Sequence, residues 1–180
     1  MQKATKPAES DATARTLNER QPKYKVNEVV SDSTNGELRL CGARRMMMNP
    51  LAMCDKLDKM FGSGAEAIVH YMLFESGRDT FDAIVSNNQG RSRGELLKTL
   101  VDLQPCTGWG FVSLTILQAD PPTVEVSVRN PPVKILKGSQ KQIISSYWAG
   151  VLSAYFSRQL ASKNLGYEAD KDEFNCVVTV

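Results

Sequence analysis

The chain has 180 residues, of which 42% are hydrophobic, and this length suits one sizeable core better than two. Its 22 basic and 20 acidic side chains leave a formal net charge of +2, which argues against a nucleic-acid binder that neutralises phosphates. The sequence has no run of about eighteen apolar residues and no hydrophobic signal core near its start. These features predict a cytoplasmic protein with no transmembrane segment.

The cysteines are few and far apart, with no CxxC pair that would indicate a metal or redox motif. Their density is also too low for a small secreted fold held together by disulfides. We therefore expect reduced thiols at all four positions, which are Cys41, Cys54, Cys106 and Cys176.

The first part of the chain, residues 1–23, carries many charged side chains and, after Met1, a single large aliphatic residue, Leu17. Such a composition buries too little apolar surface to offset the entropy that ordering the chain would cost. We expect a disordered N-terminal tail there and one folded domain over residues 24–180.

The domain is predicted to open with a β-hairpin. A first strand is expected over Tyr24–Val30, where apolar residues recur. An Asn35-Gly36 turn follows, and Glu37–Leu40 forms the return arm. Gly42 then permits a bend before a further strand over Arg44–Met48.

Three helices are predicted next. The first begins at Asn49-Pro50, where Asn serves as the cap and Pro as the first helical residue. The second covers Ala65 to about Ala83, and Gly77 within it suggests a close helix crossing, because glycine otherwise destabilises a helix by about 1 kcal/mol relative to alanine. The third runs from Ser92 to about Leu103, with Glu95 placed as in a capping box.

The remaining regular structure is predicted to be a sheet. Gly108–Gln118 and Thr123–Asn130 are rich in β-branched residues, alternate in polarity and should pair antiparallel. Two shorter strands, Leu165–Tyr167 and Asn175–Val180, should pair across a polar loop. The expected architecture is α+β, with an antiparallel sheet packed against a helical layer.

One long helix is expected over Ser139–Ala161. Its large apolar residues recur at i, i+1, i+4 and i+5, a stripe too wide for a surface helix, so the helix should be central. Ser146, Gly150 and Ala154 form a track of small residues at four-residue intervals. Such a track lets another backbone approach closely or leaves a cavity open, and the sequence does not distinguish these two possibilities.

No catalytic motif is present. The sequence has no GxSxG elbow, and its glycines lack the spacing and the following lysine of a phosphate loop. His70, the only histidine, is either a hydrogen-bonded structural residue or an iron ligand or pH-sensitive group. The acidic residues between Glu168 and Glu173 suit a solvated hairpin tip better than a calcium loop. We therefore expect no enzymatic activity.

Trp109 has glycine on both sides, at Gly108 and Gly110. Glycines that flank an indole are typical of a strand start where a backbone or a ligand comes close. A tryptophan packed at a sheet edge explains the pattern equally well, so both interpretations stay open from the sequence alone.

Several short segments, taken in chain order, resemble the 4-vinyl reductase domain family, whose members are described as hydrocarbon-binding domains. The resemblance covers about residues 24–180. The segments that carry it are Gly36–Leu40 with Gly42 and Arg44, Gly64–Ala67 through Glu75–Arg78, Gly108-Trp109-Gly110, Ala149–Leu152 and Cys176.

The resemblance has implications for fold and partners. The family is similar in fold to the core subunits of TRAPP vesicle-tethering complexes and, more distantly, to haem-binding nitric-oxide sensor domains. Those relatives share a buried apolar cavity beside the helices, used for acyl chains, aromatic compounds or haem, and several form dimers. Aromatic-effector sensors of the family usually feed an attached output domain, and we expect any signal here to pass to another chain.

The resemblance breaks down at a zinc motif. Many members end in a pattern of Glu, two residues, Cys, seven residues, Cys that contributes to a zinc site. Aligned on Cys176, this chain has Leu165 and Glu168 at the two earlier positions. One thiolate and one carboxylate are too few for a closed structural zinc site, so we expect no metal and no cofactor.

Three functions are compatible with these observations. The first is a stand-alone, non-catalytic module that holds a small apolar or acyl ligand in a helix-lined cavity and acts through a partner. The second is a TRAPP-like structural subunit of a trafficking or scaffold assembly, a homodimer or a heterodimer with a related subunit, whose interface includes the helix Leu51–Phe61. The third, an accessory to tetrapyrrole reduction, follows only from the family's name. For the first function, the expected ligand-binding residues are Tyr147, Trp148, Val151 and Tyr155, with Trp109 or Phe111 closing the site.

Overall fold

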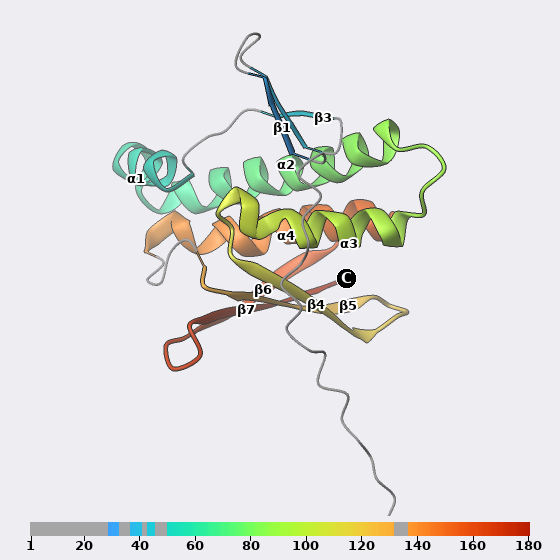
Figure 1. Ribbon diagram of the computed structural model, residues 1–180. Helices are drawn as coiled ribbons and strands as arrows, with labels where there is room; N and C mark the ends of the chain where they lie inside the picture. Colours follow the sequence, from blue (N-terminus) through green and yellow to red (C-terminus); the bar gives the residue numbers. More distant parts are fainter. Residues whose placement is uncertain (1–28, 33–36, 41–42, 46–49, 132–136) are drawn as a thin grey trace, which may run out of the picture.

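The computed structural model describes residues 29–32, 37–40, 43–45, 50–131 and 137–180. Figure 1 shows them as stacked layers, with a four-stranded sheet, then helices α3 and α4, then α2, and a small sheet beyond α2. This arrangement confirms the predicted α+β architecture. The predicted tail and the Asn35-Gly36 turn lie outside the described residues.

The larger sheet is antiparallel. Its strands lie in the order β4 (Phe111–Gln118), β5 (Thr123–Arg129), β7 (Glu173–Thr179) and β6 (Ala161–Glu168). In β5, Val126 lies opposite Leu114 on one side and Cys176 on the other. Val124, Val126 and Val128 are all buried, because alternate residues of a strand point to the same face, here the helical one.

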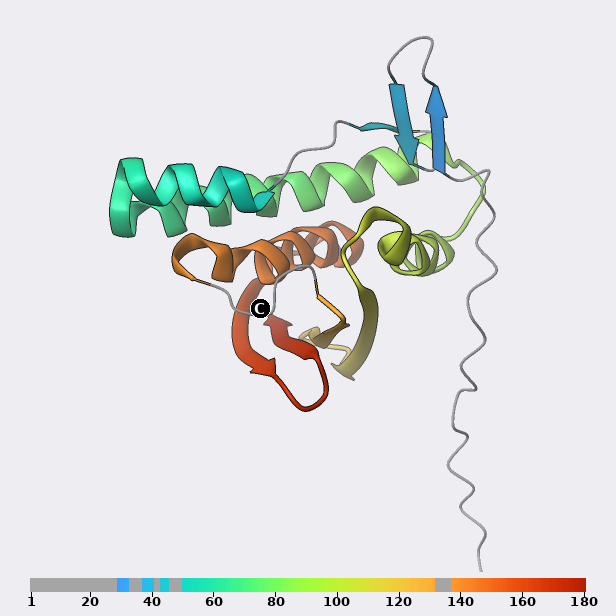
Figure 2. The same cartoon turned by 60° about the vertical axis from the view of Figure 1, so that its left-hand side comes forward.

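Helix α4 (Gln142–Phe156) is central, as the sequence predicts. It lies between the larger sheet and α2 (Ala65–Asn87), and every residue from Ile143 to Ala154 is buried. Helix α3 (Arg93–Leu103) lies beside it and contacts β4 (Figure 2). Because α4 is covered on several sides, its apolar stripe is wider than that of a surface helix.

Two glycines set the distance between α2 and α4. A Cβ atom at Gly150 would overlap the carbonyl oxygen of Phe74, and a Cβ atom at Gly77 would overlap the carbonyl oxygen of Tyr147. The two backbones are therefore in direct contact, which only residues without a Cβ atom allow. The track of small residues thus admits a neighbouring helix, and the helix crossing predicted at Gly77 is confirmed.

The smaller sheet lies on the far side of α2 from the larger one (Figures 1 and 2). It is antiparallel, in the order β1 (Val29–Asp32), β2 (Glu37–Leu40) and β3 (Ala43–Arg45), and β2 coincides with the predicted return arm. Helix α1 (Pro50–Phe61) then begins at the predicted proline and contacts α2.

The long helix is shorter than the sequence predicts. A 3-10 turn over Gly138–Lys141 precedes α4, and the helix ends at Phe156 rather than Ala161. Ser157 adopts a left-handed conformation with φ of 54°, and the Arg158 N–H donates to the Ser153 carbonyl at 3.1 Å. This C-terminal cap turns the chain, so that β6 begins well before the predicted strand at Leu165.

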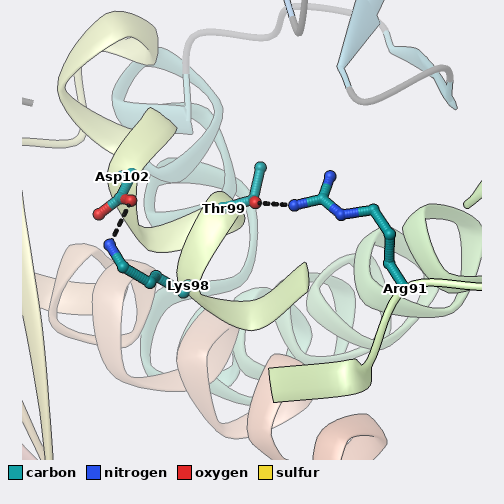
Figure 3. A network of polar contacts seen from close by, with 4 residues as sticks. All are labelled: Arg91, Lys98, Thr99 and Asp102. Carbon is teal, nitrogen blue, oxygen red and sulfur yellow. Dashed lines mark hydrogen bonds and ion pairs between the residues drawn. The ribbon is translucent and has the colours of Figure 1, made fainter. Parts of the chain in front are cut away.

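Helix α3 begins with the predicted capping box. Ser92 Oγ accepts from the Glu95 N–H at 3.2 Å, and the Ser92 N–H donates to the Glu95 carboxylate at 2.9 Å. Figure 3 shows two further contacts, in which Lys98 pairs with Asp102 at 2.7 Å and Arg91 donates to Thr99 Oγ1 at 2.8 Å. All of these bonds lie within α3 and the residues just before it, so they stabilise the helix itself.

Replacing the cap should weaken the fold in a pH-dependent way. We expect Ser92→Ala to lower the free energy of unfolding by about 1 kcal/mol at neutral pH, because a helix-terminal N–H loses its acceptor. Hydrogen bonds from the Ser92 backbone and side chain also hold the pKa of Glu95 below its usual range. A lowered folded-state pKa stabilises the fold above the unfolded pKa, and this contribution is lost as the pH falls through the lowered pKa. Urea unfolding should therefore show that Ser92→Ala lowers the free energy of unfolding less at acidic pH than at neutral pH. An equal loss at the two pH values would contradict the link between the cap and the charge of Glu95.

Candidate functional site

One side of α4 carries Trp148, Leu152 and Tyr155. Their spacing of i, i+4 and i+7 places them on the same side of the helix. Leu152 and Tyr155 line a groove between α4, α3 and β4, so this side of α4 faces those two elements. Trp148 lies one turn before Leu152, is fully buried and is not itself among the residues that line the groove.

The groove has a volume of about 270 Å³ and is mainly apolar. Helix α3 contributes Leu97 and Val101, and strand β4 contributes Leu114 and Ile116. Ile116 remains 58% exposed, so the groove is open to solvent at β4. An open apolar hollow of this size suits a small apolar molecule.

Tyr155 is fixed in the wall of the groove by two aromatic contacts. Its ring meets Phe81 edge-on at 5.9 Å between centroids and Phe156 edge-on at 4.8 Å. A Cβ atom at Gly94 would lie 3.8 Å from the Tyr155 hydroxyl, so this hydroxyl lies close to the start of α3. The groove therefore has one positioned hydroxyl group in an apolar lining.

Three of the other predicted ligand residues form an aromatic cluster. Trp109 stacks on Tyr147 at 5.1 Å between centroids, and Tyr147 meets Trp148 edge-on at 5.8 Å. Tyr147 and Trp148 are buried, as is Val151, whose backbone N lies against Gly77 of α2. The structure thus places three of the six predicted residues in the packed core, and Trp109, like Tyr155, is partly buried against it.

The indole N–H of Trp148 is buried and has no acceptor among the described residues. A buried donor without a partner costs about 1–3 kcal/mol, so such groups are rare and need a physical explanation. A ligand oxygen that accepts from this N–H is one explanation that the position of Trp148, on the groove side of α4, supports.

Phe111 lies away from the groove. Side chains of a strand alternate between faces, so Phe111 points to the opposite side of β4 from Leu114 and Ile116. It is 46% exposed, and the Arg129 guanidinium lies 5.7 Å from its ring centroid. The geometry does not support the hypothesis that Phe111 closes the site.

Trp109 packs at the edge of the sheet. It immediately precedes β4, an edge strand, and its ring covers Tyr147. A Cβ atom at Gly110 would lie 2.6 Å from the Arg129 carbonyl oxygen, so this glycine admits the neighbouring backbone of β5. The contacts match both interpretations that the sequence left open, because a neighbouring backbone lies close at Gly110 and the tryptophan itself is packed at the sheet edge.

The sequence analysis missed the groove walls supplied by α3 and β4. The spacing in each element does predict a shared apolar face. Leu97 and Val101 are four residues apart on a helix, and Leu114 and Ile116 are two residues apart on a strand. Neither pattern shows which element lies opposite. That pairing depends on how α3 and β4 pack around the end of α4.

His70 and Cys176 have surroundings that suit structural rather than chemical roles. His70 Nδ1 lies 2.8 Å from Ser146 Oγ and so links α2 to α4, in agreement with a structural histidine. Burial in β7 raises the pKa of the Cys176 thiol to about 12, which keeps it protonated and unreactive at neutral pH. Within the described ranges, no group of three His, Cys, Asp or Glu side chains is arranged to hold a metal ion.

In the part of the chain that the structure describes, no helix combines the length and the apolar character needed to cross a bilayer.

The sequence matches no protein-family model and no curated protein. Solved structures do match. The phenol-responsive sensory domain of the transcription activator PoxR, in a crystal structure with phenol, matches with a TM-score of 0.65 and 15% identity over 86% of this chain and 85% of that chain. A vinyl-4-reductase family protein from Methanocaldococcus jannaschii matches with a TM-score of 0.42 and 14% identity over 76% of this chain and 98% of that chain.

The PoxR match shows a shared fold. The resemblance predicted from the sequence is thus confirmed at the level of the fold alone.

Proposed function

We propose that this chain is a non-catalytic module that binds a small aromatic molecule along the groove side of α4 and acts through a partner. One observation carries the proposal: an apolar groove and a buried indole N–H without a described acceptor lie on the same side of one helix. A ligand in the groove would gain binding free energy from buried apolar surface, at about 25 cal/mol for each Å² of that surface removed from water. The N–H supplies a directional contact.

The chemistry of the lining favours an aromatic ring that carries an oxygen. The Trp148 indole can only donate a hydrogen bond, whereas the Tyr155 hydroxyl can donate or accept. Both lie on the side of α4 that bears Leu152, and the remaining lining is mostly aliphatic. Phenol has this chemistry, and the similar fold of a sensory domain solved with phenol adds support. Tyr147, Val151 and Trp109 do not line the groove, so in this proposal they support the site only through the packing of the core.

A comparison of phenol with toluene tests the proposal. The two molecules are similar in size, but only phenol has an oxygen that can accept from Trp148. We expect the wild-type protein to bind phenol more tightly than toluene in isothermal titration calorimetry. Trp148→Phe should lower the phenol affinity by about 5- to 100-fold and leave the toluene affinity nearly unchanged, because one charge-neutral hydrogen bond is lost.

Trp109→Phe is the matched control, since it also removes an indole N–H, but from a residue at the sheet edge that stacks on Tyr147 and does not belong to the groove side of α4. This variant should keep the preference for phenol. The proposal fails if neither molecule binds saturably, or if Trp148→Phe retains the wild-type preference.

The structural-subunit function is favoured by a different observation. Four large apolar residues of α1 and α2, namely Met60, Phe61, Tyr71 and Met72, are between 40% and 71% exposed. Large exposed apolar side chains on two helices that pack together suit a protein interface.

Analytical ultracentrifugation tests this second function separately from ligand binding. If α1 and α2 form a dimer interface, the protein should sediment as a dimer, and Phe61→Glu with Tyr71→Glu should convert it to a monomer. Leu117→Glu, at a residue of β4 that is equally exposed, should not change the mass. A wild-type monomer at high concentration would contradict the homodimer.

A further inference from the structure

A second cavity, of about 420 Å³, lies where α2, the start of α3 and the end of α4 meet. Three arginines from three segments line it: Arg78 from α2, Arg93 from α3 and Arg158 from the turn after α4. Among the described residues of the lining, Asp82 is the only carboxylate. The lining of the cavity therefore carries more positive than negative side chains, and two further carboxylates outside the lining, Glu75 and Asp120, each pair with one of the arginines.

Arg93 is held in the wall by two contacts. Its Nη2 donates to the Ala154 carbonyl near the end of α4, and its guanidinium carbon lies 5.2 Å from the centroid of the Phe81 ring. Its Nε is buried and has no acceptor in the described part of the chain. Because the side chain is fixed, this remaining donor keeps its position before any ligand arrives.

The other two arginines have donors to spare. Arg78 Nη1 lies 3.5 Å from the Glu75 carboxylate, and Arg158 Nη1 lies 2.9 Å from the Asp120 carboxylate. Both arginine side chains are about half exposed, so solvent screens the two pairs and either guanidinium can reorient at little cost. A guanidinium has five N–H donors, and each of these pairs uses one nitrogen.

We propose that this cavity binds the phosphate or carboxylate group of a small anionic molecule, with Arg93 as the fixed donor and Arg78 and Arg158 as adjustable ones. The planar fork of a guanidinium matches two oxygens of either group. Arg93 is also the first residue of α3, where the helix dipole adds partial positive charge. The volume lies in the range of small-molecule sites, so the anionic group belongs to a larger molecule than an inorganic ion.

Nuclear magnetic resonance titrations of the full chain at low ionic strength test this site, with inorganic phosphate and succinate as separate probes. At least one probe should give saturable shifts at the amides of Ser153 and Ser157, which line the cavity. Arg78→Gln with Arg158→Gln should weaken that affinity by about tenfold or more, as expected for charge-assisted hydrogen bonds.

A matched double variant separates this site from a general charge effect. Lys56→Gln with Lys163→Gln also removes two exposed positive charges, from residues outside the cavity, and should weaken binding by less than about twofold. Because Arg93 also anchors α4, the variant at Arg78 and Arg158 is the decisive one. Saturation by phosphate alone would identify a phosphate site, and saturation by succinate alone a carboxylate site. The proposal is overturned if neither probe saturates, or if both double variants weaken binding equally.

Discussion

Gly150→Ala is expected to lower the free energy of unfolding by about 3 kcal/mol or more, and Gly77→Ala by a similar amount. A Cβ atom at Gly150 would lie 2.8 Å from the Phe74 carbonyl carbon and 3.0 Å from the Arg78 amide nitrogen. These are backbone atoms of α2, so relief requires the whole helix to move away from α4. Urea unfolding of each variant measures the cost.

Gly94→Ala is the control for this prediction. Gly94 is also helical, but the nearest atom to an added Cβ is the Tyr155 hydroxyl at 3.8 Å, an ordinary contact. Alanine should therefore be neutral there or stabilise the helix by up to about 1 kcal/mol. If Gly150→Ala proves no more costly than Gly94→Ala, the helices are not in backbone contact. The double variant at Gly77 and Gly150 should lose less unfolding free energy than the sum of the losses in the two single variants, because one shift of α2 relieves both overlaps.

The same crossing shows what the sequence could predict about the fold. Small residues at four-residue intervals in an otherwise apolar helix predicted a close neighbour or a cavity, and only the position of α2 decides between them. The end of α4 was placed too late because Leu160 continues the apolar pattern. Leu160 is indeed buried, but it lies beyond the turn at Ser157, and a serine in the left-handed conformation has no sequence signal comparable to glycine.

The candidate site was predictable only in part. Tyr155 could be placed on the same side of the helix as Trp148 and Leu152, which is the groove side, because helical periodicity relates the three residues. Phe111 could not be excluded, because the face to which a strand residue points depends on where the strand begins. The unpaired N–H of Trp148 was also inaccessible, since a sequence shows which groups can donate but not which acceptors fold around them.

Trp148→Ala is expected to lower the free energy of unfolding by about 3–5 kcal/mol in the absence of ligand. Trp148 is among the largest fully buried side chains, and its removal leaves a cavity between α4 and the sheet. Trp148→Phe should cost far less, about 1 kcal/mol, because the loss of the unpaired N–H removes a desolvation penalty that offsets part of the lost packing. Chemical unfolding of both variants without ligand measures this difference. A cost for Trp148→Phe close to that of Trp148→Ala would mean that the N–H already has a partner.

Repeating the unfolding measurements with phenol distinguishes the contribution of Trp148 to packing from its proposed contribution to binding. At about 100 times its dissociation constant, a ligand that binds only the folded state stabilises it by about 2.7 kcal/mol. A variant with about tenfold weaker affinity gains only about 1.4 kcal/mol at the same concentration. Phenol should therefore widen the stability gap between the wild type and Trp148→Phe, whereas toluene should leave that gap unchanged. Since packing alone affects both ligands equally, a gap that widens only with phenol isolates the hydrogen bond from the indole to the ligand.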